Sequence, residues 1–128
     1  ESEEEHSLMI RFLTERFGEV LFLAGSKTPE ARFLEVVAQG VHKGKALEKL
    51  CEHRKISPEE TLVFGDSEND VPLFESAAFS VAMGNAAPSV RSRADFVTES
   101  NDEEGIPCFF ESHQERFSFG TSRISRSA

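Results

Sequence analysis

The sequence predicts an α/β protein with a parallel sheet flanked by helices. Three observations carry this prediction. Short apolar runs alternate with stretches of helical spacing along residues 39–112. The run Thr61–Phe64 is followed by Gly65, a cluster of acids and a helical pattern, as strands of open α/β sheets are at their carboxyl ends. Residues 1–38 contain one helix and two strands joined by a turn, which indicates a separate α+β element.

In the first part of the chain, apolar residues at spacings of three and four predict an amphipathic helix over residues 7–17, after an acidic first turn. Two strands should follow at residues 20–24 and 33–38, with a turn over residues 25–30 between them. The next helix should run over residues 44–54, because Ala46, Leu47, Leu50 and Cys51 share one helical face.

The second part of the chain should supply the parallel sheet. Strands are expected at residues 61–64, 79–83 and 96–98, with a helix at 70–76 and helical turns at 87–93. A terminal helix over residues 101–112 should be interrupted by Gly105 and Pro107. Residues 113–128 are polar and unpatterned, which predicts a loosely ordered tail. The Phe residues are interpreted as core.

The composition limits the classes of partner that the chain could bind. The net charge of −9 disfavours nucleic acid and anionic membranes, which need a basic surface. No apolar run approaches the roughly 20 residues of a membrane span, and the acidic start is unlike a signal peptide. Cys51 and Cys108 lie far apart without metal-type spacing, which indicates reduced thiols and a cytoplasmic protein.

The acidic loop after the strand at 61–64 is the first candidate site. Asp66 follows the strand directly, so its carboxylate should project over the carboxyl edge of the sheet, and Asp70 can face the same side. Carboxylate oxygens suit a hard cation such as Mg²⁺. The alternative is helix capping, since Asp, Ser and Asn are common N-cap residues. Capping needs fewer polar residues than this loop contains, so a metal site is favoured.

Lys43, at the start of a predicted helix, is the second candidate. The positive end of the helix dipole disfavours a cation at this position, unless an anion binds between the lysine and the free backbone N–H groups. The alternative is that Lys43 is a solvated surface lysine. The helix and the following strand span similar lengths, so Lys43 and Asp66 should meet at one edge of the sheet. With Asn69, they predict a phosphate site in which Lys43 and Asn69 contact phosphate and Asp66 holds Mg²⁺.

Four motifs follow one another along the chain: Lys43-Gly44-x-Ala46-Leu47, Gly65-Asp66-x-x-Asn69-Asp70, Val81-Ala82-Met83-Gly84-Asn85-Ala86 and Ala94-Asp95-Phe96-Val97-Thr98. In this order and spacing they resemble the carboxyl-terminal half of the Cof-type sugar phosphatases, in the haloacid dehalogenase-like hydrolase superfamily. The resemblance implies a partial Rossmann-like core over residues 39–112, preceded by the tail of an α+β cap at 1–38. It implies Mg²⁺-dependent hydrolysis of a small phosphorylated metabolite, with Lys43 binding phosphate in catalysis and Asn69 contacting it. Asp66 would bind the metal, and Asp70 would act as a supporting acid in catalysis or metal binding.

The family's nucleophile motif, Asp-x-Asp-Gly-Thr, does not occur in these 128 residues. The chain is therefore interpreted as a fragment or truncated form of such a phosphatase, inactive alone. The alternative is a catalytically inactive phosphate- or partner-binding module. In either case the incomplete core could favour self-association through exposed apolar surface and a free strand edge. The loop also resembles that of P-type ion pumps, against which the lack of a membrane span and the Lys43-Gly44 motif argue.

Overall fold

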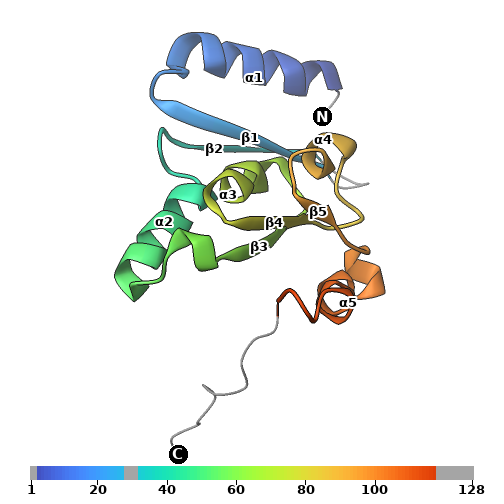
Figure 1. Ribbon diagram of the computed structural model, residues 1–128. Helices are drawn as coiled ribbons and strands as arrows, with labels where there is room; N and C mark the ends of the chain where they lie inside the picture. The colour runs from blue at the N-terminus through green and yellow to red at the C-terminus, as the bar shows by residue number, and fades with distance from the viewer. Residues whose placement is uncertain (1–2, 28–31, 118–128) are drawn as a thin grey trace, which may run out of the picture.

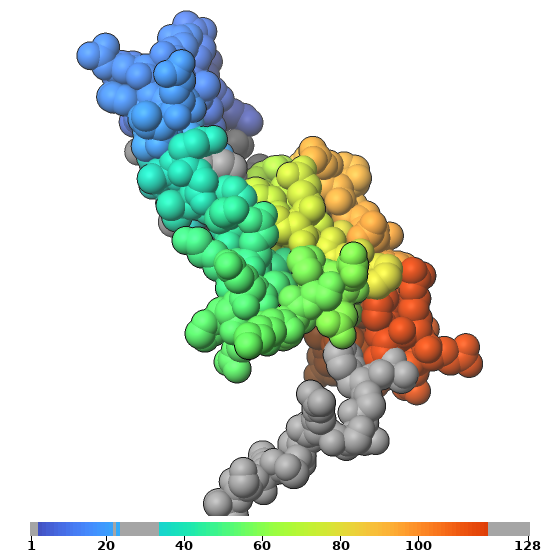
Figure 2. Space-filling view, turned by 60° about the vertical axis from the view of Figure 1, so that its left-hand side comes forward, coloured from blue at the N-terminus to red at the C-terminus, as the bar shows by residue number. Residues whose placement is uncertain are grey.

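The computed structural model describes residues 3–27 and 32–117, in which an α-helix and a β-hairpin precede a small α/β body (Figure 1). The space-filling view shows an elongated molecule, with the first helix of the chain at one end and the last helix toward the other (Figure 2). The first elements are α1 (Glu3–Phe17), β1 (Leu21–Lys27) and β2 (Arg32–Ala38). The body contains α2 (Lys43–Arg54), β3 (Leu62–Gly65), α3 (Val71–Ser76), β4 (Phe79–Ala82), α4 (Pro88–Arg91), β5 (Phe96–Val97) and α5 (Gly105–Ser112). Short 3₁₀ turns, η1, η2 and η3, lie at Pro58–Glu60, Glu68–Asp70 and Asn101–Glu103.

The α/β prediction is confirmed. Strands β3, β4 and β5 form a parallel sheet in that order, with Leu62 opposite Phe79 and Val81 opposite Phe96. Parallel neighbours need crossover connections, which α3 and α4 supply. Strands β1 and β2 form a separate antiparallel hairpin, and α1 lies along its side away from the body (Figure 1).

The two faces of the parallel sheet bury different side chains, because neighbouring residues of a strand point to opposite faces. On one face, Phe74 of α3 packs with a cluster made of Ala82, Ala86, Val90, Val63 and Ala94. On the other, Phe109 of α5 stacks edge-on against Phe64 and Phe96, with ring centroids 5.5 and 5.6 Å apart. The sheet is therefore covered on both sides, as a parallel sheet requires.

Helix α2 lies close to α3 because of Gly44. This buried glycine faces the carbonyl oxygen of Pro72, which a methyl group in its place would overlap. At the amino end of α2, the backbone N–H of Lys45 donates to His42 Nδ1 (3.2 Å), so His42 is the N-cap of this helix. The close approach of the two helices fixes where the first residue of α2, Lys43, is placed.

Several elements differ from the expectations. Strand β1 continues through Gly25 to Lys27, within the expected turn, because its backbone pairs with β2 along the full strand; residues 28–31 lie outside the described residues. The expected helix over residues 101–112 is interrupted, but at Glu104, between η3 and the start of α5 at Gly105. Pro107 causes no break, because it lies in the first turn of α5, where the helix needs no proline N–H.

The aromatic residues also depart from the expectations. Phe12 and Phe17 are 57% and 40% exposed, so they are not core in the described part of the chain. Their helix, α1, contacts the hairpin strands. Conversely, His113 stacks on Phe109 and Phe117 packs against Phe96, so the start of the expected polar tail lies against the aromatic face. Residues 118–128 lie outside the described residues.

Within residues 3–27 and 32–117, no helix combines the length and the apolar character needed to cross a bilayer. Cys51 and Cys108 are both free thiols, and Cys51 is buried.

Candidate active site

The loop after β3 is built around the carboxylate of Asp70. Its Oδ2 accepts hydrogen bonds from the backbone N–H groups of Asp66 and Ser67, each 3.0 Å away. The residue is only 4% exposed. Gly65 permits this arrangement, because a Cβ there would lie 2.5 Å from the Cβ of Asp70. The capping predicted as the alternative therefore occurs at Asp70, where it shapes the loop that presents Asp66.

The Lys43 ammonium group lies over this loop. Its Nζ is 2.5 Å from Asp70 Oδ1 and 3.1 Å from Asn69 Oδ1. The Lys43 side chain is half exposed, whereas that of Asp70 is 6% exposed. A Lys ammonium has three N–H donors, so two of them satisfy these acceptors and the third can meet a ligand from solvent.

Asp66 is exposed at the carboxyl end of β3. One of its oxygens accepts from Ser67 Oγ (3.2 Å) and the other from Asn85 Nδ2 (3.1 Å). Each carboxylate oxygen keeps further acceptor capacity, as a metal ligand must. Asn85 also accepts from the backbone N–H of Asn101 (3.1 Å), so it is fixed from two sides and orients Asp66.

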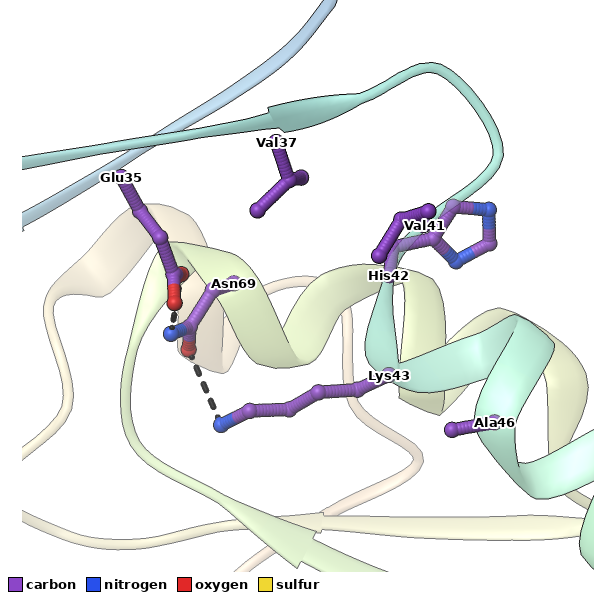
Figure 3. Close-up of a pocket in the computed structure, with 7 residues that line it drawn as sticks. All are labelled: Glu35, Val37, Val41, His42, Lys43, Ala46 and Asn69. Atoms are coloured by element: carbon purple, nitrogen blue, oxygen red, sulfur yellow. Dashed lines mark hydrogen bonds between the residues drawn. The ribbon is translucent and has the colours of Figure 1, made fainter.

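Asn69 connects the body to the hairpin. Its Nδ2 donates to Glu35 Oε2 on β2 over 2.8 Å, while its Oδ1 accepts from Lys43. These side chains point toward one another across a cavity of about 280 Å³ between the hairpin and the body (Figure 3). The cavity is lined by Glu35, Val37, Val41, His42, Lys43, Ala46 and Asn69.

The residues fit a metal site of the sparse kind that Mg²⁺ uses. No three His, Cys, Asp or Glu side chains converge as a metal cage within the described residues. Mg²⁺, however, usually keeps several waters and takes one or two carboxylates plus substrate phosphate oxygens. The exposed Asp66 carboxylate meets that requirement. Asp70 accepts three hydrogen bonds within the protein, which favours a supporting role over direct metal ligation.

Outside this loop, Lys45 and Glu48 form an exposed pair on α2, 2.6 Å apart. Their hydrogen bond and then their opposite charges raise the pKa of Lys45 and lower the pKa of Glu48. Since Lys45 pairs along its own helix and does not line the cavity, it offers a matched control for Lys43.

The structure brings Lys43, Asn69 and Asp70 into direct contact and joins Asp66 to them through Asp70. Lys43 thus contacts the loop that carries Asp66, at the carboxyl end of β3. Its meeting with the Asp66 carboxylate itself and the binding roles of these residues remain predictions. Sequence reasoning did not single out Glu35, for which the available signal is a lone acid within the apolar strand expected at residues 33–38. Asn85 stands in one of the four motifs but was given no role in the site.

A parallel α/β body with lysine, amide and carboxylates at the carboxyl edge of its sheet is typical of phosphoryl-transfer enzymes. A model of the haloacid dehalogenase-like hydrolases matches residues 1–110, and the chain belongs to this family.

Several relatives are described as phosphatases. A putative phosphatase of Haemophilus influenzae is 32% identical over 83% of this chain and 43% of its own length. The solved structure of the subclass IIB sugar phosphatase BT4131 matches 83% of this chain and 39% of its own, with a TM-score of 0.73 and 32% identity. A haloacid dehalogenase-like hydrolase from B. subtilis matches 92% of this chain and 39% of its own, with a TM-score of 0.70 and 34% identity. The part of this chain that matches covers between 13% and 43% of the length of these curated relatives.

Proposed function

We propose that this chain forms the phosphate- and metal-binding part of a Mg²⁺-dependent phosphatase that hydrolyses small phosphate esters such as sugar phosphates. One observation carries the proposal: the Lys43 ammonium is held against Asn69 and Asp70, in the loop that also carries the exposed Asp66. The similarity to a sugar phosphatase over 83% of this chain supports the choice of substrate class.

The charges around the site support the need for a divalent cation. Among the described side chains, the site contains the carboxylates of Glu35, Asp66 and Asp70 and one ammonium group, that of Lys43. A phosphate dianion entering this site would meet net repulsion at close range. A cation bound at Asp66 would reverse that balance and supply charge neutralisation to the phosphoryl oxygens.

Each residue then has a distinct task. Lys43 binds a phosphoryl oxygen through its free N–H, and Asn69 contributes its amide. Asp66 holds the cation, with Asn85 fixing the orientation of its carboxylate. Asp70 positions both the loop and Lys43. Such preorganised charge is the main contribution of a protein to phosphoryl transfer.

The attacking group is not among these residues. The sequence contains no Asp-x-Asp, so we place the nucleophilic aspartate outside these 128 residues. The substrate is a small phosphorylated metabolite. The free thiols of Cys51 and Cys108 fit a reducing compartment, which supports a cytoplasmic location.

The test is a phosphatase assay of the full-length protein, as its gene encodes it, against a panel of sugar phosphates with and without Mg²⁺. We expect Mg²⁺-dependent turnover that falls more than about 100-fold in Asp66→Asn. Asp102→Asn removes an exposed acid of η3 and should leave turnover unchanged. Turnover that is unaffected by Asp66→Asn would contradict the role of Asp66. Absence of turnover would favour the non-catalytic phosphate-binding module.

A further inference from the structure

Glu35 is the only acid among the seven side chains that line the cavity between hairpin and body. It reaches in from β2 and accepts a hydrogen bond from Asn69, whose amide oxygen in turn accepts from Lys43. The carboxylate therefore stands one side chain away from the ammonium to which we assign phosphate. The rest of the lining consists of the apolar side chains of Val37, Val41 and Ala46, together with His42 (Figure 3).

We propose that Glu35 selects the organic part of the substrate, favouring esters with hydroxyl or ammonium groups next to the phosphate and rejecting esters with a carboxylate there. This inference rests on the proposed function, because it assumes that the phosphoryl group lies on Lys43 and Asn69. It adds a specificity-determining residue from the hairpin to the binding residues of the body.

The cavity geometry gives the reason. A phosphoryl group at Lys43 and Asn69 leaves the organic part of the ester in the same cavity of about 280 Å³. Its neighbours there are the Glu35 carboxylate, the apolar side chains and His42, whose Nδ1 already accepts from the backbone N–H of Lys45. A hydroxyl or an ammonium can donate to the free lone pairs of Glu35. A carboxylate would instead set two like charges against each other in a partly enclosed cavity, where their repulsion exceeds that in water.

The closeness of Glu35 to Asn69 makes the carboxylate a fixed feature of the site. The hydrogen bond is 2.8 Å long and joins residues 34 positions apart in the chain. Because the amide nitrogen of Asn69 faces Glu35, its oxygen faces Lys43. The same contact that holds Asn69 thus keeps the negative charge turned toward the cavity.

The experiment compares two esters of one carbon skeleton, sn-glycerol 3-phosphate and 3-phosphoglycerate, which differ in a hydroxymethyl group and a carboxylate. The kcat/KM of the full-length protein is measured for both with Mg²⁺, in the wild type and in Glu35→Gln. Glutamine keeps an acceptor for Asn69 and removes only the charge. We expect the wild type to prefer the glycerol ester, and Glu35→Gln to reduce that preference about tenfold, chiefly by raising kcat/KM for 3-phosphoglycerate.

The matched control is Glu19→Gln, which removes an exposed acid from the turn before β1 and should leave the preference unchanged. Turnover of both esters with the same preference in wild type and Glu35→Gln would overturn this inference and leave the proposed function standing. An equal shift in Glu19→Gln would also overturn it, since the effect would then come from net charge. Absence of Mg²⁺-dependent turnover of any phosphate ester would overturn the inference together with the proposed function.

Discussion

Replacing Asp70 by alanine tests whether this side chain holds the loop that presents Asp66. The nearly buried carboxylate accepts from the backbone N–H groups of Asp66 and Ser67 and from Lys43. Alanine leaves both N–H groups without that acceptor, and each unsatisfied group costs about 1–3 kcal/mol. Because the loop is partly open to water, we expect about 2 kcal/mol of local stability to be lost, which is about a thirtyfold change in the opening equilibrium.

Hydrogen exchange of the full-length protein measures this directly. Amide exchange at Asp66 and Ser67 should become about thirtyfold faster in Asp70→Ala, and Asp70→Asn should fall between alanine and wild type because it keeps one acceptor oxygen. Asp102→Ala, at an exposed position on η3, should leave these two amides unchanged. Equal protection of Asp66 and Ser67 in wild type and Asp70→Ala would refute the assignment of Asp70 as the centre of the loop.

Two further predictions concern the supports of the site. Gly44→Ala should lower the free energy of unfolding by about 2–3 kcal/mol in urea titrations, because the new methyl group would overlap the Pro72 carbonyl and lie 2.6 Å from Ser76 Oγ; an unchanged midpoint would show that the two helices can separate freely. Asn85→Ala should weaken Mg²⁺ binding by at least about tenfold in calorimetric titrations, since it frees the Asp66 carboxylate that Asn85 holds at 3.1 Å. Equal Mg²⁺ affinity in both proteins would contradict that orienting role.

The parallel sheet and the meeting of Lys43 with the acidic loop were predictable from the sequence. The runs that became β3 and β4 are short, apolar and bounded by turn residues, so their type was readable locally. The connection lengths then placed the start of α2 and the end of β3 at the same edge, because crossover units return the chain to that edge. Lys43, Asn69 and Asp70 are in contact as a result.

What the sequence did not predict depends on contacts between distant elements. The partner of Glu35 is set by how the hairpin lies against η2, and no local pattern records that placement. Proline breaks the interior of a helix but is tolerated in its first turn. The effect of Pro107 therefore depended on where α5 begins, which residue spacing did not fix. Phe117 packs on the aromatic face although it lies in a polar segment.

The most direct test of the central claim is the Mg²⁺-dependent binding of inorganic phosphate to the full-length protein, measured by calorimetry in wild type, Lys43→Met and Lys45→Met. Both lysines lie in the first turn of α2, but only Lys43 contacts Asn69 and Asp70. We predict that phosphate binds only with Mg²⁺ present, that Lys43→Met weakens binding at least about tenfold, and that Lys45→Met leaves it unchanged. Equal phosphate affinity in wild type and Lys43→Met would contradict the claim that this ammonium and the loop that carries Asp66 form a phosphate site.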